Sequence, residues 1–382
     1  MKALDIVHIY PGTAGSAGLY IDSIFKALSG GFSQECLVNY YFPFNYGRKI
    51  YYKVTENTGP NFFSGLPLIR LVARYFELIL ALFYSYFFIQ IRKPKIVNYS
   101  LTSNLKIEYA FLSMLKLTTN VAIVLTCHDV VPFDASFVNF NKAKRARKKF
   151  FDIADYLLVH NENSRTDLHE SYGVESDKLI QHKFPPMKLA KLSGFKGALH
   201  NKKEVSSRDE KKVVFVFVGH LRKEKGIQTL LEAWRLKKSN NSVLKISGNA
   251  PEGVAIDIGD LNGVSLNEVF LTDTEYINEI KSADYVILPY ERGTNSGIPS
   301  SVVDAGAIPI TSDIGMFKNN ELLDQSLFFE SSNELELARV IDHFACLSSG
   351  TKELKTLDLK RRLDLYQLHF ESEINRTYSA IV

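Results

Sequence analysis

The chain has 382 residues, 46% of them hydrophobic and 23% charged, which is enough apolar material for two domains of ordinary size. Its net charge of +4 argues against a dedicated nucleic-acid binder, because such proteins usually carry a stronger basic excess. Its three cysteines lie far apart and form neither a metal-binding spacing nor a disulfide framework, which favours a reducing compartment such as the cytoplasm.

Short β-branched runs alternate with helical patterns through the first half of the chain. The run Ala3–Tyr10 is too short for the apolar core of a signal peptide, so we expect it to form the first strand. Helical patterns also follow the later runs KIVNYS, VAIVLTCHD and DYLLVHN. Nearly continuous apolar strands that alternate with helices predict a parallel sheet covered on both faces.

The most hydrophobic segment of the chain is Leu78–Ile89, which is flanked by basic residues on both sides. A membrane-spanning helix needs about 20 apolar residues, so we do not expect this segment to cross a bilayer. Two interpretations stay open. The segment is either a core helix that ends at the following Lys-Pro-Lys step, or a helix half sunk in a membrane surface.

The segment KAKRARKKF, residues 142–150, carries six basic residues in nine positions. It is either the solvated face of a helix or a patch for anionic lipid headgroups or a lipid-linked pyrophosphate. Nucleic acid is the weaker interpretation, because no nucleic-acid-reading motif accompanies the charge.

The strand–helix alternation breaks between Gln181 and Ser207 and then restarts. The runs VVFVFVG, VLKISGN, EVFLTD, DYVILPY and IPITSD predict a second doubly wound unit, and Glu334–Phe344 and Leu354–Tyr378 are expected to be helices. The predicted domains are residues 1–190 and 211–355, joined by a linker over 191–210. A C-terminal helix within 356–382 is expected to pack back toward the first domain. Two such domains facing each other predict a ligand-binding cleft at the carboxyl ends of the strands.

Positive charge gathers where the run VVFVFVG turns into a helix. Gly219 ends the strand, and the apolar helix face begins at Ile227, so residues 220–226 form a loop at the carboxyl end of a strand. The N-terminus of a helix attracts anions, and Arg222 and Lys225 add cations at the same place. The stretch predicts a diphosphate site; the alternative is a solvated turn whose charges bind nothing.

A second polar loop follows the strand that ends at Pro289-Tyr290. It contains two glycines, and Thr294, Asn295 and Ser296 supply small hydrogen-bond donors. Gly297 permits close approach of a ligand to the backbone. A helix is expected to begin near Pro299, because proline is tolerated in the first turn. The sequence therefore predicts a second anion-receptive loop in the same domain.

These motifs together resemble the retaining glycosyltransferases of family 4. The resemblance rests on strand-GxxRxxKG-helix, then LPYxxxxxSG and G-x-x-P-I, and it covers most of the chain. It implies an α/β GT-B fold of two Rossmann-like domains, in which Arg222 and Lys225 are catalytic residues that hold the donor diphosphate. His220 stands where the family usually has arginine, so Arg222 is expected to take that role. The donor-binding residues implied are Gly15, Ser16, Gly219, Tyr290, Thr294, Asn295, Ser296 and Gly297.

The chain departs from the family at two acidic positions. Many members carry two glutamates eight positions apart around the second loop, whereas here Thr294 stands at the first and Ser301 or Val302 at the second. This pattern resembles the TxSG subgroup, in which small residues and backbone amides face the donor. The departure puts acid-assisted handling of the donor sugar in doubt.

In the first domain, two strand ends carry candidate site residues. His128 can orient substrate or hydrogen-bond the reacting sugar, and the His128-Asp129 pair matches the pattern of the family. Asp129 is expected to orient neighbouring backbone, and His160 and Asn161 are candidates to line the cleft. The glycine loop of residues 12–18 is not a dinucleotide fingerprint. By resemblance, Gly15 and Ser16 lie there against donor phosphate and acceptor.

The sequence thus predicts a nucleotide-sugar-dependent, retaining hexosyltransferase without metal or cofactor. The expected donor is a UDP- or GDP-sugar, and the expected acceptor is a glycan or polyprenyl-linked glycan in bacterial capsule, lipopolysaccharide O-antigen or exopolysaccharide synthesis. The enzyme is expected in the cytoplasm, with peripheral membrane contact and no nucleic-acid partner. The alternative is a non-catalytic partner subunit of the same fold that binds a sugar nucleotide or another transferase. Further rivals are a sugar-nucleotide epimerase and a phosphorylase.

Overall fold

The structure is a computed structural model of the chain. It describes residues 4–10, 17–40, 42, 44, 46–51, 67–100, 105–128, 130, 137–189, 212–251, 256–293 and 295–382. The expected linker over 191–210 therefore lies outside the described residues. Two compact units emerge: unit 1 comprises Met1–Pro185 with His369–Val382, and unit 2 comprises Pro186–Leu368.

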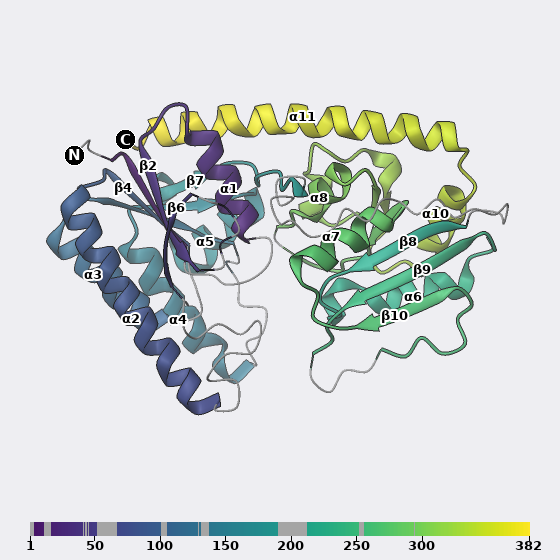
Figure 1. The fold of residues 1–382 in the computed structure, drawn as a ribbon, viewed down its shortest axis with the longest axis horizontal. Helices are drawn as coiled ribbons and strands as arrows, with labels where there is room; N and C mark the ends of the chain where they lie inside the picture. The colour runs from purple at the N-terminus through teal and green to yellow at the C-terminus, as the bar shows by residue number, and fades with distance from the viewer. Residues whose placement is uncertain are drawn as a thin grey trace. The chain divides into compact units, whose positions relative to one another are not determined.

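Unit 1 is built on a parallel seven-stranded sheet with the strand order β3-β2-β1-β4-β5-β6-β7 (Figure 1). The middle strands β1, β4 and β5 are almost wholly buried, as their continuous apolar runs predict. The strands are β1 Ile6–Tyr10, β2 Gln34–Asn39, β3 Arg48–Tyr51, β4 Ile96–Ser100, β5 Ala122–Thr126, β6 Tyr156–Val159 and β7 Leu179–Gln181. The helices are α1 Ala17–Leu28, α2 Pro67–Arg92, α3 Leu105–Thr118, α4 Phe137–Ile153 and α5 Glu162–Tyr172, with the short 3-10 helix η1 Ser176–Lys178.

Unit 2 repeats the principle with a parallel six-stranded sheet of order β10-β9-β8-β11-β12-β13. Its strands are β8 Val213–Val218, β9 Ser242–Gly248, β10 Val264–Glu268, β11 Tyr285–Leu288, β12 Ile308–Ser312 and β13 Phe328–Phe329. Its helices are α6 Ile227–Leu236, α7 Asp273–Ser282, α8 Ile298–Asp304, α9 Gly315–Lys318 and α10 Glu334–Ala345, with the short 3-10 helices η3 Lys223–Lys225 and η4 Gln325–Leu327. The expectation of a doubly wound α/β fold is confirmed.

Two expected elements of the sequence differ in the structure. The run EVFLTD is not a strand: β10 ends at Glu268, and the side chains of Val269 and Phe270 are exposed rather than packed. The apolar segment Leu78–Ile89 is the second half of a much longer helix, α2, that begins at Pro67. Helix α2, with 26 residues, is therefore longer than the segment from which the sequence predicts a helix too short to cross a bilayer, and that prediction is wrong about the length.

Helix α11, Ser349–Ser379, is one continuous helix shared by the two units. Its last turns belong to unit 1, where Phe370, Ile374 and Tyr378 are fully buried. There the side-chain amide of Asn375 donates to the carbonyl oxygen of Ala27 at 2.7 Å. The chain therefore returns to its first unit at its C-terminal end.

A line of buried polar side chains crosses the sheet of unit 1. Thr126 donates to the Oδ1 of Asn98 at 3.2 Å, and the Nδ2 of Asn98 donates to the Nδ1 of His8 at 3.1 Å. The Nε2 of His8 lies 3.0 Å from the Oε1 of Gln34. This pattern suits a neutral imidazole protonated on Nε2. Burial lowers the pKa of His8 to about 4, because the charged ring would lose its water.

Replacing His8 with asparagine should weaken the acid sensitivity of unit 1. The unfolded chain protonates His8 near its ordinary pKa of 6.5, whereas the folded chain does so only near 4, so stability is lost as pH falls between these values. From pH 7 to pH 5 the wild type should lose about 2 kcal/mol more than His8→Asn. Chemical denaturation of both proteins at the two pH values measures this difference, and equal losses would contradict the neutral ring. Between pH 8 and pH 7 the two should change alike.

Candidate functional site

The loop after β8 is anchored so that His220 and Arg222 flank a buried leucine. The backbone N–H of Gly219 donates to Ser247 at 3.0 Å, and that of Leu221 donates to Asn249 at 2.9 Å. Leu221 is fully buried. The chain then forms η3, passes Gly226 in the left-handed region with φ of 67°, and enters α6. His220 and Arg222 therefore lie on either side of the anchor, at the carboxyl end of β8.

The electrostatics of this loop favour an anion. The Nη1 of Arg222 lies 3.7 Å from Glu224, and the side chain of Arg222 stays 43% exposed. Desolvation, together with the positive charges of Arg222 and Lys225, lowers the pKa of His220, while a hydrogen bond to Asn249 opposes the shift. His220 is therefore neutral at pH 7, and the positive charge of the loop is carried by its lysines and Arg222.

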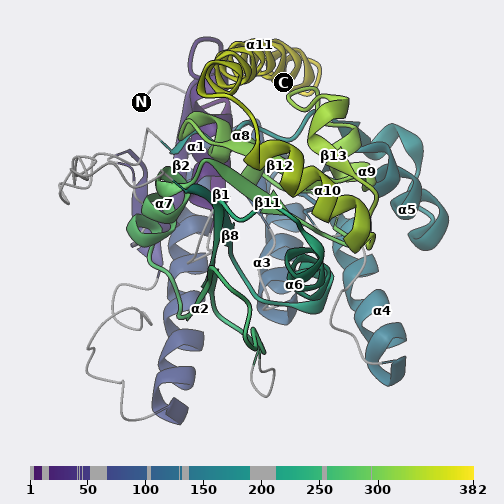
Figure 2. The same cartoon turned by 90° about the vertical axis from the view of Figure 1, so that its right-hand side faces the viewer.

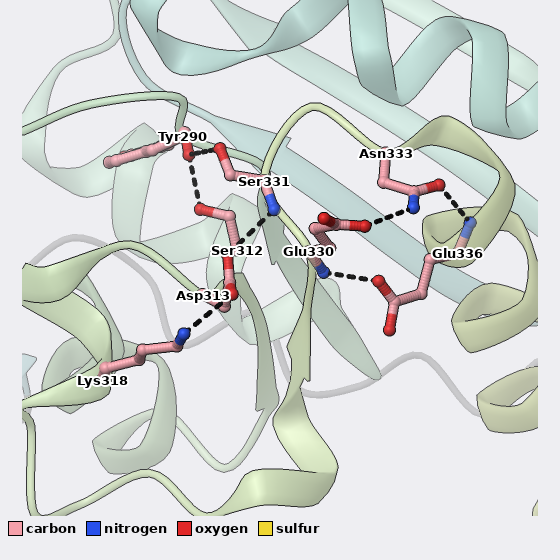
Figure 3. A network of polar contacts seen from close by, with 8 residues as sticks. All are labelled: Tyr290, Ser312, Asp313, Lys318, Glu330, Ser331, Asn333 and Glu336. Atoms are coloured by element: carbon pink, nitrogen blue, oxygen red, sulfur yellow. Dashed lines mark hydrogen bonds and ion pairs between the residues drawn. The ribbon is translucent and has the colours of Figure 1, made fainter.

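After β11 the chain passes through Pro289 to Tyr290, whose backbone carbonyl group is held by two serines. The Tyr290 side chain is buried, and its carbonyl oxygen accepts hydrogen bonds from Ser312 at 2.5 Å and Ser331 at 3.3 Å (Figure 3). Asp313 accepts from the backbone N–H of Ser331 at 2.9 Å and pairs with Lys318 at 2.9 Å. This network ties the ends of β11, β12 and β13 together.

A second part of the same network reaches α10. The carboxylate of Glu336 accepts from the backbone N–H of Glu330 at 2.7 Å, and Asn333 caps the helix by accepting from the N–H of Glu336 at 2.9 Å. The amide of Asn333 also donates to Glu330 at 2.7 Å (Figure 3). These bonds fix the segment that carries Ser331.

The two predicted loops touch. The Nζ of Lys225 lies 3.7 Å from the centre of the Tyr290 ring, within the range of a cation–π contact. The backbone N–H of Glu291 donates to the carbonyl oxygen of Glu224 at 3.0 Å. Gly226 packs directly on Pro289, since a Cβ at Gly226 would lie 1.7 Å from the Pro289 carbonyl oxygen. Sequence reasoning placed the loops in one domain; the structure shows them in direct contact.

The last part of the β11–α8 loop packs against Met187, at the glycine that the sequence assigns to the approach of a ligand. Helix α8 begins at Ile298, with proline in its first turn, as predicted. A Cβ at Gly297 would lie 2.2 Å from the Sδ of Met187, so packing against this side chain accounts for the glycine. Asn295 and Ser296 are partly exposed, and Thr294 lies outside the described residues. The donor-binding roles assigned to these residues stay predictions.

The positions expected to replace the second glutamate of family 4 point into the protein. The hydroxyl of Ser301 donates to the Met187 carbonyl oxygen at 3.0 Å. The neighbouring Ser300 accepts a hydrogen bond from the backbone N–H of Met187 at 2.9 Å. Ser301 is 3% exposed and Val302 is fully buried. Neither residue offers an acid or a free hydroxyl to a ligand.

In unit 1 the predicted histidines belong to one aromatic cluster. The ring centre of Tyr20 lies 4.5 Å from that of His128 and 5.4 Å from that of His160. The ring of Phe184 lies 5.0 Å from His160. His128 is partly buried, while Asp129, Gly15 and Ser16 lie outside the described residues. The cluster gives His128 a fixed orientation at the end of β5.

His160 and Asn161 have structural contacts that the sequence did not reveal. His160 is 7% exposed; its Nε2 lies 3.1 Å from the Tyr20 hydroxyl and its Nδ1 3.3 Å from the carbonyl oxygen of His182. Burial, with the nearby rings of His182 and His128, holds the pKa of His160 well below its usual range. Asn161 caps α5 by accepting from the N–H of Ser164 at 2.8 Å. These contacts explain both residues without a ligand.

Comparison with known proteins assigns the architecture. Residues 200–345, which include both loops of unit 2, match the family model described as glycosyl transferases group 1. The fold is similar to that of Alr3699/HepE from Anabaena, solved in complex with UDP and glucose, with a TM-score of 0.62 at 13% identity over 99% of this chain and 98% of that one. The chain has the GT-B fold.

Two further GT-B structures show the same likeness. The catalytic domain of starch synthase IV from Arabidopsis thaliana, bound to ADP and acarbose, aligns with a TM-score of 0.63 at 12% identity over 99% of this chain and all of that one. A glycosyltransferase from Rickettsia africae aligns with a TM-score of 0.62 at 14% identity over 100% and 99%. No curated protein sequence matches the chain. These likenesses establish the fold and leave the assignment to family 4 a prediction.

Sequence reasoning missed the residues that hold Tyr290 in this GT-B unit. Ser312 and Ser331 come from different strand ends and meet only in the folded sheet. The one sequence signal was the polar end of the run IPITSD, which places Ser312 and Asp313 after a buried strand. Ser331, after the two-residue strand β13, had no such signal.

Gly226→Ala should destabilise unit 2. The left-handed φ disfavours alanine, and the new methyl group would overlap the Pro289 carbonyl, so we expect a loss of at least about 2 kcal/mol in the free energy of unfolding. Gly350→Ala is the matched control, because a Cβ there meets nothing within 4 Å. Chemical denaturation compares the two, and a Gly226→Ala protein as stable as the control would refute the close contact.

Gly297→Ala should be coupled to Met187. The added methyl group would overlap the Met187 side chain and cost about 1–3 kcal/mol. Met187→Ala removes the obstacle, so the double variant should be more stable than the two single losses predict, by about 1 kcal/mol or more. A double-mutant cycle of unfolding free energies measures this coupling. Strict additivity would mean that Met187 is not what excludes a side chain at Gly297.

Proposed function

We propose that the protein is a glycosyltransferase that moves a sugar from a nucleotide-sugar to a glycan or lipid-linked glycan acceptor. The observation that carries the proposal is the contact between the two loops of unit 2, which brings Lys225 over Tyr290 with Arg222 in the same loop. The match of residues 200–345 to group 1 glycosyltransferases and the UDP complex of a structural neighbour support it. UDP- or GDP-sugars are the expected donors.

The chemistry follows from the charge of this loop. When the bond between sugar and diphosphate breaks, negative charge develops on the leaving phosphate. Arg222, as a fork, and Lys225, as a point charge held by the Tyr290 ring, stabilise that charge. This assignment needs no metal ion, so turnover should persist in the presence of a chelator. Gly219, at the end of β8, is the further proposed donor-binding residue of this loop.

The finer features of the reaction are part of the proposal. Retention of the anomeric configuration is supported by the family resemblance, with the acceptor attacking on the leaving group's own face and a donor phosphate oxygen helping to remove its proton. His128, oriented by Tyr20, is proposed to bind the reacting sugar. Bacterial surface polysaccharide synthesis in the cytoplasm is the proposed setting.

One observation favours the second candidate, a non-catalytic partner subunit that binds a sugar nucleotide. The positions that correspond to the second glutamate of the resembling family, Ser301 and Val302, are buried and supply no acid. Binding of a nucleotide without turnover, across a range of acceptors, would favour this candidate.

Lys225→Ala should abolish most of the activity, whereas Lys223→Ala should not. Both lysines lie in η3, but Lys223 is exposed and only Lys225 contacts Tyr290. Loss of one charge-stabilising group should reduce nucleotide release by about 100-fold or more. The assay is nucleotide release from UDP-, GDP-, ADP- and CMP-sugars with and without a membrane lipid extract, with thermal stabilisation by each nucleotide as a parallel reading. Near-wild-type turnover by Lys225→Ala would contradict the proposal that this lysine stabilises the leaving diphosphate.

A further inference from the structure

Helix α2 has two apolar faces, and the described residues of the chain cover only one of them. The covered face carries Leu78, Ala81, Leu82 and Ile89, all nearly inaccessible, and it packs on α3 and β3. In the second half of the helix, even the one polar residue on this side, Ser85, is fully buried and bonded to the carbonyl oxygen of Ala81. This face is part of the core of unit 1.

The other face of α2 is a continuous apolar stripe. Its large side chains recur at steps of three and four residues, the spacing of one helix face, and each is 51–65% exposed. They are Val72, Phe76, Leu80, Phe83, Phe87 and Ile91. The stripe runs for about 30 Å along the helix. Between Tyr75 and Ile91 the helix has a single charged residue, Glu77. A monomeric soluble protein rarely leaves so long an apolar strip in water.

Because one face of α2 is packed against its own domain, the helix can bind a membrane along its surface but cannot cross it. By length and composition alone, Leu68–Arg92 is long and apolar enough to span a membrane. Crossing a bilayer would require α2 to leave α3 and β3 and would expose the core residues around Leu82. A helix fixed along one side to its domain can instead lie in the plane of the interface, with its free apolar face in the acyl boundary.

Positive charge lies in the same layer of helices, on α4, with α3 between α4 and α2. Helices α2, α3 and α4 contribute to one core cluster, so they cover the same face of the sheet, with α3 packed on both neighbours (Figure 2). Lys148 and Lys149 of α4 are exposed. A surface hollow of about 400 Å³ is lined by Lys144, Arg145, Lys148, Ser171 and Tyr172.

The positive charges of α4 favour an anionic membrane over a second copy of the chain as the partner of the apolar stripe. A second copy of the chain would offer apolar side chains to the stripe but no anionic partner to the lysines of α4, because its equivalent helices carry the same positive charge. An anionic bilayer offers acyl chains to the stripe and phosphate groups to the lysines at once. We propose that the exposed face of α2 and the cations of α4 dock unit 1 onto the surface of an anionic membrane. This inference uses no residue of the proposed donor loops and stands or falls independently of them.

The first test is flotation of the full-length protein with vesicles. Vesicles of phosphatidylcholine with phosphatidylglycerol should bind it, and vesicles of phosphatidylcholine alone should bind it more weakly. The triple variant Phe76→Ser, Phe83→Ser, Phe87→Ser should bind the anionic vesicles roughly tenfold or more weakly. The matched control removes three similarly exposed leucines from α11, Leu354→Ser, Leu357→Ser and Leu368→Ser, and should bind as the wild type does.

The charge half of the proposal has its own pair of variants. Lys144→Gln, Lys148→Gln and Lys149→Gln should each weaken binding to anionic vesicles by about fivefold, and salt should reduce the difference. Lys238→Gln, Lys281→Gln and Lys360→Gln, which change exposed lysines of unit 2, should have no effect.

A second measurement keeps the test decisive if the serine variant does not fold. In a Cys346→Ser background, where Cys36 and Cys127 are buried, Phe83→Cys carries an environment-sensitive dye, and Leu357→Cys carries it in the control. Anionic vesicles should shift the emission of the dye at position 83 to the blue and leave that at 357 unchanged. The proposal would be overturned if the triple serine variant of α2 bound vesicles as strongly as the wild type. It would also be overturned if the wild type bound no vesicles but formed a concentration-dependent dimer, and the same α2 variant dissociated that dimer. Equal dye responses at both positions would also overturn it.

Discussion

The proposed donor site depends on the contact between two loop backbones in unit 2. Gly226 can lie against the Pro289 carbonyl only because it has no side chain, and the Glu291 N–H then reaches the Glu224 carbonyl. This pairing brings the Nζ of Lys225 to 3.7 Å from the ring centre of Tyr290. The backbone pairing thus places Lys225 beside Tyr290, and the ring contact holds its flexible side chain, which needs little further ordering when an anion arrives.

The same contact explains why the carbonyl oxygen of Tyr290 accepts two hydrogen bonds. An aromatic ring can hold a lysine in place only if the ring itself does not move. Ser312 and Ser331 fix the Tyr290 backbone from the next two strands, and Asp313 fixes Ser331 in turn. The GT-B unit therefore supports its first loop through the second, and the second through polar groups at the ends of β12 and β13.

Local patterns in the sequence were sufficient for the fold and for the loops of unit 2. Continuous β-branched runs predicted the buried strands, and Gly219 together with the helix face that begins at Ile227 predicted that the first loop lies at a strand end. Periodicity failed where tertiary contacts decide. The run EVFLTD has the composition of a strand, yet the pairing with β9 ends at Glu268. Asn161 follows β6 and is predicted to line the cleft; the structure adds that its side chain caps α5 through the local bond from Ser164, and its role toward a ligand stays a prediction.

Helix α2 shows a further place where the sequence leaves two interpretations open. A helix that is apolar all round is usually buried all round, but its composition fits both a core helix and a helix half sunk in a membrane surface. Here one side faces the core and the other faces solvent, and no pattern of residue types separates the two, because both need leucine and phenylalanine. The difference lies in what surrounds the helix: α3 and β3 cover one side, and the described part of unit 1 leaves Phe76, Phe83 and Phe87 exposed. A helix of this kind can do two things at once. Its covered face holds it to the core of its domain, and its exposed apolar face is available to a membrane surface.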